Sequence, residues 1–370
     1  TDKFVADSLG AELLQQRTLT HNVNIDARGD AAAQEITTMT TGASGLEATL
    51  EVSNFQVMTN RTFDGRHNVL NQMSYSYDVA GGDLMQVSEI RSMGFAPSGV
   101  AREQNIVTYA DILKTQIIES KHVVNSIILS NGNVRLSEID IYRTAAISGD
   151  GGDITFQDLQ EHQRIETSLF DARGNALTQN IRKVYYASDG ATIIGSDVQK
   201  ITNAAYDIHD RTSQSTIENY EVTGEGDIFT DVQVIKYLSY DRYGNGEHQT
   251  IDTFDNLSMA TANLISHKDI TNNYGAEGAT IDVQLVDGTI ITKSATFARK
   301  RGTALSSVSV ETDKDGLLIQ RNVTTTSLFD VRGNAVNQST DKFVADELGA
   351  EKLATRTAIH NSTIDARGNA

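Results

Sequence analysis

The sequence contains no cysteine and no tryptophan, and Pro97 is the single proline among its 370 residues. Without cysteine the chain has no disulfide, no thiolate zinc site and no cysteine nucleophile. Aromatic residues make up only 6% of the chain, whereas a thick globular core usually carries more aromatic bulk. The composition therefore favours thin, layered packing of Val, Ile, Leu and Thr over a compact enzyme.

Basic residues are also scarce, because 31 Lys and Arg stand against 49 Asp and Glu and give a net charge of −18. Nucleic acids and anionic membrane surfaces both bind basic faces, so neither is an expected partner. No apolar run approaches the ~18 residues of a membrane-spanning helix. We therefore expect no direct membrane insertion in this segment.

Glycine is abundant, with 28 residues, and many of them belong to one recurring motif. Its clearest copies are Phe170–Gln179 and Phe329–Gln338, in which Gly follows Asp by three positions and Gln follows it by eight. Asp at the first position of a type I turn can accept the backbone N–H two residues on, and Gly at the fourth accepts positive φ. The motif therefore predicts strand–turn–strand units. The structural turn residues assigned on this basis are Asp7, Gly10, Asp26, Gly29, Asp78, Gly81, Asp171, Gly174, Asp241, Gly244, Asp330, Gly333, Asp365 and Gly368.

The residues beside the turns alternate between apolar and polar types, as in half-buried strands. This alternation predicts that Ile165, Thr167 and Leu169 share one face. Two stretches, 107–128 and Phe4–Arg17, have apolar residues near helical spacing. We assign both to strands, since the first is rich in Ile and Val and the second follows the turn motif.

Turns recur roughly every 14–22 residues, which is enough for two short strands and a turn. Further turn glycines in this series are Gly45, Gly99, Gly132, Gly152, Gly190, Gly226, Gly278, Gly302, Gly316 and Gly349. We predict an all-β protein of tandem stacked β-hairpins that form an elongated tube or solenoid.

A much longer repeat joins the two ends of the sequence. Residues 340–346 repeat residues 1–7, and the match continues to Gly29 and Gly368 at a constant offset of 339 without a gap. We interpret 1–339 as one long repeat unit built of hairpin repeats of about 17 residues, and 340–370 as the start of the next unit. The sequence is then expected to be a window from a longer tandem protein.

The aromatic-Asp-x-x-Gly core resembles the YD repeat of RHS proteins, teneurins and Tc-type toxin shells. The best matches are Tyr240–Asn245, Phe170–Asn175, Phe329–Asn334 and Tyr77–Gly81. The resemblance implies long hairpins laid side by side in a spiralling sheet. Nothing in the sequence resembles the plug or the self-cleaving protease region of that family, and the long repeat argues against a closed shell. The resemblance thus supports a tube or solenoid.

No catalytic motif and no metal-ligand motif stands out, so we expect no enzyme activity and no cofactor. The pairs Glu161–His162 and Glu247–His248 lack a second nearby ligand. Calcium is the one ligand worth weighing, because Gly149–Phe156 partly resembles the calcium nonapeptide of RTX proteins and Asp313–Gly316 is a small acidic turn. The nonapeptide occurs once, however, whereas a calcium site of that kind needs tandem copies.

The leading functional hypothesis is a structural repeat segment of a giant extracellular or cell-surface protein, prokaryotic in origin, that forms a filament, sheath or tube. Its expected partner is itself, by self-association or by continuation of the same chain along a fibre. The alternative is an adhesin whose array displays a carbohydrate- or protein-binding face, with Tyr185, Tyr186, Tyr237 and Tyr240 as a candidate aromatic patch. A polysaccharide-processing enzyme on a β-solenoid ranks third, since it needs carboxylates that converge in one groove.

Overall fold

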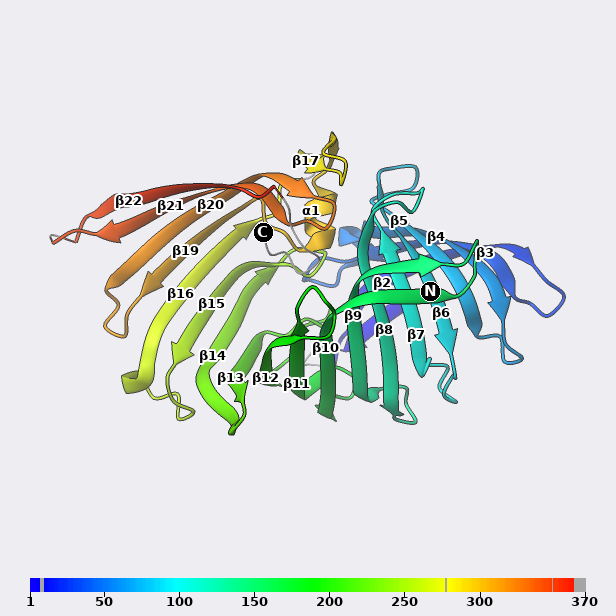
Figure 1. The fold of residues 1–370 in the computed structure, drawn as a ribbon, viewed down its shortest axis with the longest axis horizontal. Helices are drawn as coiled ribbons and strands as arrows, with labels where there is room; N and C mark the ends of the chain where they lie inside the picture. Colours follow the sequence, from blue (N-terminus) through cyan, green and yellow to red (C-terminus); the bar gives the residue numbers. More distant parts are fainter. Residues whose placement is uncertain (7–9, 277, 348, 363–370) are drawn as a thin grey trace. The chain divides into compact units, whose positions relative to one another are not determined.

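Strands dominate the computed structural model, which describes residues 1–6, 10–276, 278–347 and 349–362. These residues form 22 strands, one α-helix and two short 3-10 helices (Figure 1). The prediction of an all-β protein built from consecutive hairpin strands is therefore confirmed. Contacts divide the chain into two units, residues 1–198 with 208–210, and residues 199–207 with 211–370.

In the first unit, every strand from β1 to β11 pairs antiparallel with its neighbour in the chain. Among the described residues β1 pairs with β2 alone, so this ladder starts at an open edge. The strands are β1 (Asp2–Ala6), β2 (Glu12–Ile25), β3 (Ala31–Thr40), β4 (Glu51–Phe63), β5 (Val69–Tyr77), β6 (Leu84–Met93), β7 (Glu103–Tyr109), β8 (Ile117–Ile128), β9 (Val134–Ile147), β10 (Ile154–Phe170) and β11 (Ala176–Tyr186), with a 3-10 helix at Glu47–Thr49. Strand β12 (Ile193–Asn203) spans the boundary between the units.

The second unit repeats this chain-order pairing, with one insertion. Its strands pair antiparallel from β13 to β16, then from β16 to β19, and onward to β22. The inserted β17–β18 hairpin attaches through a short parallel contact between β17 and the end of β20. The elements are β13 (Gln214–Thr223), β14 (Gly226–Tyr240), β15 (Gly246–Phe254), β16 (Leu264–Asn273), β17 (Thr280–Gln284), β18 (Ile290–Ser294), α1 (Thr296–Arg301), β19 (Ser306–Thr312), β20 (Leu318–Asp330), β21 (Ala335–Ala345) and β22 (Glu351–His360), with a 3-10 helix at Thr261–Asn263.

Among the described residues, both stretches with near-helical spacing contain strands and no helix, as predicted. Residues 107–128 contain the end of β7 and all of β8, and Phe4–Arg17 contributes to β1 and β2. The β-branched side chains of the first stretch lose rotamer freedom in a helix and pack well on a pleated sheet.

Helix α1 was not predicted, and it corrects one turn assignment. Gly302 does not close a hairpin but ends this helix, at φ 69°, with its N–H bonded to the carbonyl groups of Ala298 and Arg299. A left-handed glycine is a common helix C-cap because it carries no Cβ. Gly302 therefore has the positive φ that the turn assignment predicts, but it ends a helix and does not close a hairpin. None of the described helices has the length and apolar content needed to cross a membrane.

The alternation predicted for Ile165, Thr167 and Leu169 is wrong at its last position. Thr167 is 4% exposed, whereas Leu169 is 54% exposed. The β10–β11 register shifts between these two residues, so a β-bulge lies at Ser168. An extra residue in one strand reverses the face on which the following side chains point.

The cores are small and mainly aliphatic. In the first unit Val87, Val107 and Tyr109 are buried under partly buried side chains that include Ile147 and Phe156. In the second unit the largest buried side chains are Phe297 and Phe329, and Val283 and Val336 are also buried. Much of the remaining interior is polar, so hydrogen bonds between side chains carry part of the cohesion.

Candidate functional site

The Asp–Gly turn has a defined hydrogen-bonded geometry, seen in full at Asp171. Its Oδ1 accepts the backbone N–H groups of Arg173 and Asn175 at 2.8 Å each, and its Oδ2 accepts the side-chain amide of Asn175 at 3.0 Å. Gly174 donates its N–H to the carbonyl of Asp171 at 3.2 Å and has φ 93°. The carboxylate thus accepts two backbone N–H groups that the turn would otherwise leave without a hydrogen-bond partner.

Other assigned turns share this arrangement. At Asp26, Asp241 and Asp330 the Oδ1 atom accepts the N–H groups two and four residues on, and the glycine three residues on has φ between 90° and 93°. Where Asn follows the glycine, its amide binds Oδ2, at 2.8 Å from Asn245 and 3.0 Å from Asn334. This third contact gives the Asn of the motif a physical role.

The remaining assigned turn residues differ or lie outside the description. The loop at Asp78 is longer, and its inner bond runs from Gly82 N–H to the Val79 carbonyl, with Gly81 at φ 75°. Gly10 has φ 81°, but its partner Asp7 lies outside the described residues, as do Asp365 and Gly368. In the loop at 148–153, positive φ falls on Gly149 and Gly151 and not on the assigned Gly152.

The turn hydrogen bonds lower the pKa of the carboxyl groups that accept them. The backbone N–H of Asp30 is the main cause at Asp26. Asp64 forms a turn of the same kind, accepting the N–H groups two and four residues on, and there the Asn68 side chain is the main cause. At Asp171 burial acts to raise the pKa, but the bonds from Asn175 outweigh it and lower the pKa. The turns therefore stabilise the ionised form of the aspartate.

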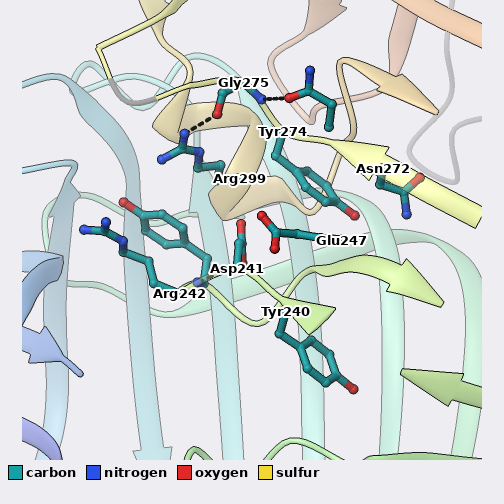
Figure 2. Close-up of a pocket in the computed structure, with 10 residues that line it drawn as sticks. Tyr240, Asp241, Arg242, Glu247, Asn272, Tyr274, Gly275 and Arg299 are labelled. Carbon is teal, nitrogen blue, oxygen red and sulfur yellow. Dashed lines mark hydrogen bonds between the residues drawn. The ribbon is translucent and has the colours of Figure 1, made fainter. Parts of the chain in front are cut away.

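A pocket of about 460 Å³ lies beside the Asp241 turn, where the ends of β14 and β16, the start of β15 and helix α1 converge (Figure 2). Figure 2 shows Glu247 and Asp241 on one side of the pocket near the ring of Tyr274. It is lined by Tyr240, Asp241, Arg242, Tyr243, Glu247, Asn272, Asn273, Tyr274, Gly275 and Arg299.

Hydrogen bonds hold the walls of this pocket. Arg299 donates to the carbonyl of Gly275, whose own N–H binds Asn273 Oδ1 at 2.8 Å. Asn272 donates its amide to the carbonyl of Gly246 at 3.0 Å. Helix α1 is therefore tied to the loop after β16, which fixes the opening of the pocket.

The tyrosines around the pocket are partly buried. Burial raises the pKa of Tyr240, and burial together with the charges of Asp241 and Glu247 raises the pKa of Tyr274. The Tyr240 ring stacks on Tyr237 with 5.3 Å between centroids. Phenols, carboxylates, amides and a guanidinium around one concave surface can bind a polyhydroxylated ligand by hydrogen bonds and ring contact.

Glu89 forms the most buried charged cluster of the first unit. Its side chain is fully buried and accepts hydrogen bonds from Arg61 at 2.8 Å, Arg91 at 3.0 Å and Lys114 at 2.8 Å. Burial acts to raise the Glu89 pKa, but the three cationic donors outweigh it and lower the pKa to about 2. Arg61 also binds Asp150 at 2.9 Å.

The same cluster holds the Gly149–Phe156 loop that resembles a calcium nonapeptide. Arg91 donates to the Gly152 carbonyl at 3.0 Å, and Asn71 donates to the Gly151 carbonyl at 2.6 Å. These contacts, with the Arg61–Asp150 ion pair, place two guanidinium groups against the acidic loop.

The histidines considered as ligands pair with carboxylates on neighbouring strands. His162 Nδ1 lies 2.7 Å from Asp140 Oδ1, and His248 Nε2 lies 3.0 Å from Asp269 Oδ1. Within the described ranges, no group of three or more His, Asp or Glu side chains is placed to hold a metal ion.

Sequence reasoning did not find the pocket or the Glu89 cluster. Tyr237 and Tyr240 of the proposed aromatic patch do stack, while Tyr185 and Tyr186 lie on β11 of the first unit. Tyr274 and Arg299 reach the pocket from a loop and a helix for which the turn motif carries no signal.

Known proteins give little further guidance. No protein-family model and no curated protein sequence matches the chain. Among solved structures, the TcdB2-TccC3-Cdc42 complex has a TM-score of 0.14 at 11% identity, over 95% of this chain and 24% of that chain. TcdB2-TccC3 without its hypervariable C-terminal region has a TM-score of 0.14 at 12% identity, over 96% and 22%. A Photorhabdus luminescens Tc holotoxin pore gives 0.14 at 12% identity, over 95% and 24%.

This chain thus spans about a quarter of the length of the solved chains it resembles. At these TM-scores the likeness carries no argument about fold or function.

Proposed function

We propose that this chain is a structural repeat segment of the YD type, from a giant extracellular or cell-surface prokaryotic protein that forms a filament, sheath or tube. The role is mechanical and spatial, without enzyme activity or a cofactor. The observation that supports it best is the pairing of strands in chain order from β1 to β11. Such an array grows in one direction as hairpins are added.

Physical chemistry favours growth by addition. A single hairpin leaves an apolar face and a strand edge that it cannot satisfy alone. The next hairpin covers both, and stability then accumulates as a sum of neighbour contacts. The same Asp-centred geometry at Asp26, Asp171, Asp241 and Asp330 repeats the device that reverses the chain.

The charge of the chain fits a filament that remains dispersed. A net charge of −18 keeps like surfaces apart in solution and disfavours bundling at low salt. We therefore expect raised ionic strength to promote lateral association of filaments.

Imaging of chains with one, two and three tandem units tests this proposal. We expect particle length to rise in equal steps with unit number in cryo-electron micrographs, at constant width. Globules whose diameter grows in all directions would contradict the structural role.

The pocket beside the Asp241 turn favours a second candidate, an adhesin that binds carbohydrate. Tyr240, Tyr243 and Tyr274 supply ring faces, and Glu247 and Asn272 supply hydrogen-bonding groups, around about 460 Å³. Aromatic rings and planar polar groups are the chemistry that binds sugar rings.

A glycan array with the intact chain tests the adhesin. We expect bound glycans to be lost in Tyr274→Ala and Glu247→Gln, and to be kept in Tyr186→Phe on β11 as a matched control. Binding that survives both pocket substitutions, or silence across the array, would count against this candidate.

A further inference from the structure

The strand pairs β1–β2 and β21–β22 have the same register at an offset of 339. In the first, Asp2 pairs with Arg17, Phe4 with Leu14 and Ala6 with Glu12. In the second, residues with the same names pair in the same way, including the same bulge after the Lys that precedes Phe. The Arg–Asp ion pair also recurs, at 2.8 Å between Arg17 and Asp2 and 2.6 Å between Arg356 and Asp341.

The two copies differ in which neighbour they have. On one side of the second copy, β20 pairs with β21. Arg321 of β20 lies 4.1 Å from the ring centroid of Phe343 and binds Glu351 at 2.7 Å. The equivalent residues of the first copy are Phe4, which is 54% exposed, and Glu12, which is also exposed.

On the other side, the first copy has a neighbour where the second has none in the described residues. Strand β3 pairs with β2, and Arg17 reaches Glu47 at 2.7 Å while His21 lies 3.5 Å from Glu35. Every residue of β22 is exposed. The Arg356 side chain is 66% exposed, against 29% for Arg17.

The first copy of the hairpin therefore has a neighbouring strand beside β2, and the second copy has one beside β21. Each copy leaves open the side that the other fills. Two edges of this kind, exposed and with unpaired backbone groups, pair with another strand when one of matching register is supplied.

We propose that β22 is the docking edge for the β3 segment, residues 31–40, of a second copy of the unit joined in tandem. The register is that of β2 with β3, so Arg356 lies opposite Met39 of the added copy, and His360 opposite Glu35. The added Glu47 then becomes the second carboxylate partner of Arg356. This inference rests on the proposed structural function and specifies the joint through which the array continues.

The repeat offset defines how a second copy is joined in tandem for the test. Ala370 is the equivalent of Ala31 at the offset of 339, and Ala31 is the first residue of β3. When residue 32 of a second copy follows Ala370, the chain between β22 and the added β3 has the same length as the chain between β2 and β3.

Hydrogen exchange tests the joint in the complete chain. We compare residues 1–370 with an extended chain, 1–370 followed by residues 32–339, in which the sequence 351–360 still occurs once. We expect amides of 351–360 to exchange at least tenfold more slowly in the extended chain. A matched extended variant with Thr37→Pro and Met39→Pro in the added copy alone is expected to return to the fast exchange. The N–H groups at these alternate positions face the β2 side of β3, as the N–H of Thr41 does when it binds the Gln15 carbonyl, and proline cannot donate to a ladder.

Unchanged exchange at 351–360 in the extended chain would overturn the proposed joint, as would protection that survives the two prolines. Small-angle scattering of the same samples separates this inference from the filament function. Protection in a particle that does not lengthen supports the joint and contradicts the filament. Lengthening without protection contradicts the joint and leaves the filament proposal in place.

Discussion

Gln72 lies directly opposite Asn60 on the neighbouring strand and donates its side-chain amide to Asn60 Oδ1 over 2.6 Å. Asn60 in turn donates to Gln34 Oε1, and Gln34 donates to Asn22. Each Gln follows a turn Asp by eight residues, and its partner precedes that Asp by four. The Gln of the repeat motif is therefore a cross-strand partner at the base of the turn.

We expect Asn60→Ala to be more costly than Gln179→Ala. Asn60 is 4% exposed and also donates to the Ala31 carbonyl at 2.9 Å. Its loss leaves the buried Ala31 carbonyl and the partly buried amides of Gln34 and Gln72 without this partner, at about 2–3 kcal/mol of the free energy of unfolding. Gln179 makes a single side-chain bond to Thr167 at 3.2 Å, so its loss is expected to cost about 0.5–1 kcal/mol. Urea unfolding followed by circular dichroism measures both, and equal losses would rule out the amide ladder as a source of stability.

The strands and their reversals could be predicted because their causes are local. A turn needs one carboxylate and one residue with positive φ, and Asp171 and Gly174 stand three positions apart in the sequence. Strand type follows from nearby β-branched residues, as at 107–128. Signals that act over a few residues survive without any knowledge of tertiary contacts.

Features that depend on distant residues could not be predicted. Glu89 is neutralised by Arg61 and Lys114, which lie 28 and 25 residues away on other strands and loops. The bulge at Ser168 depends on the register of β10 against β11. The pocket beside the Asp241 turn includes Arg299 of α1, the helix inserted between β18 and β19.

Alanine at two turn glycines separates backbone strain from steric overlap. Gly29 and Gly174 have nearly equal φ angles of 91° and 93°. A Cβ at Gly29 meets nothing within 4 Å, whereas at Gly174 it lies 2.8 Å from Asn133 Oδ1. We expect Gly29→Ala to lower the free energy of unfolding by about 1 kcal/mol, from the left-handed conformation alone. Gly174→Ala should cost about 1 kcal/mol more, because the Asn133 side chain has to move. The reverse order in thermal unfolding would refute this assignment.

Arg321→Ala is expected to loosen the last hairpin without unfolding the chain. The substitution removes an ion pair with Glu351 and a cation–π contact with Phe343. Both groups are partly exposed, so we expect a loss of about 1 kcal/mol. Amides of β21 and β22 should then exchange about fivefold faster, since 1.4 kcal/mol corresponds to a factor of ten. Lys314→Ala, in the exposed turn before β20, serves as the control and should leave these amides unchanged.

Glu89→Gln is expected to remove much of the acid sensitivity of the first unit. The folded-state pKa of Glu89 is about 2, against an ordinary value of 4.5. Because the folded pKa is the lower one, the stabilisation is fully present above pH 4.5 and is lost as the pH falls towards 2. Its size at neutral pH is about 3 kcal/mol.

We therefore expect Glu89→Gln to be less stable by about that amount at pH 7, with the difference from the unsubstituted chain shrinking steadily below pH 4.5. As a control, Glu225→Gln in the exposed β13–β14 turn should change neither the stability at pH 7 nor its dependence on pH. A constant gap between the Glu89 variant and the unsubstituted chain from pH 7 to pH 2 would mean that the buried carboxylate acts through its shape and not through its charge.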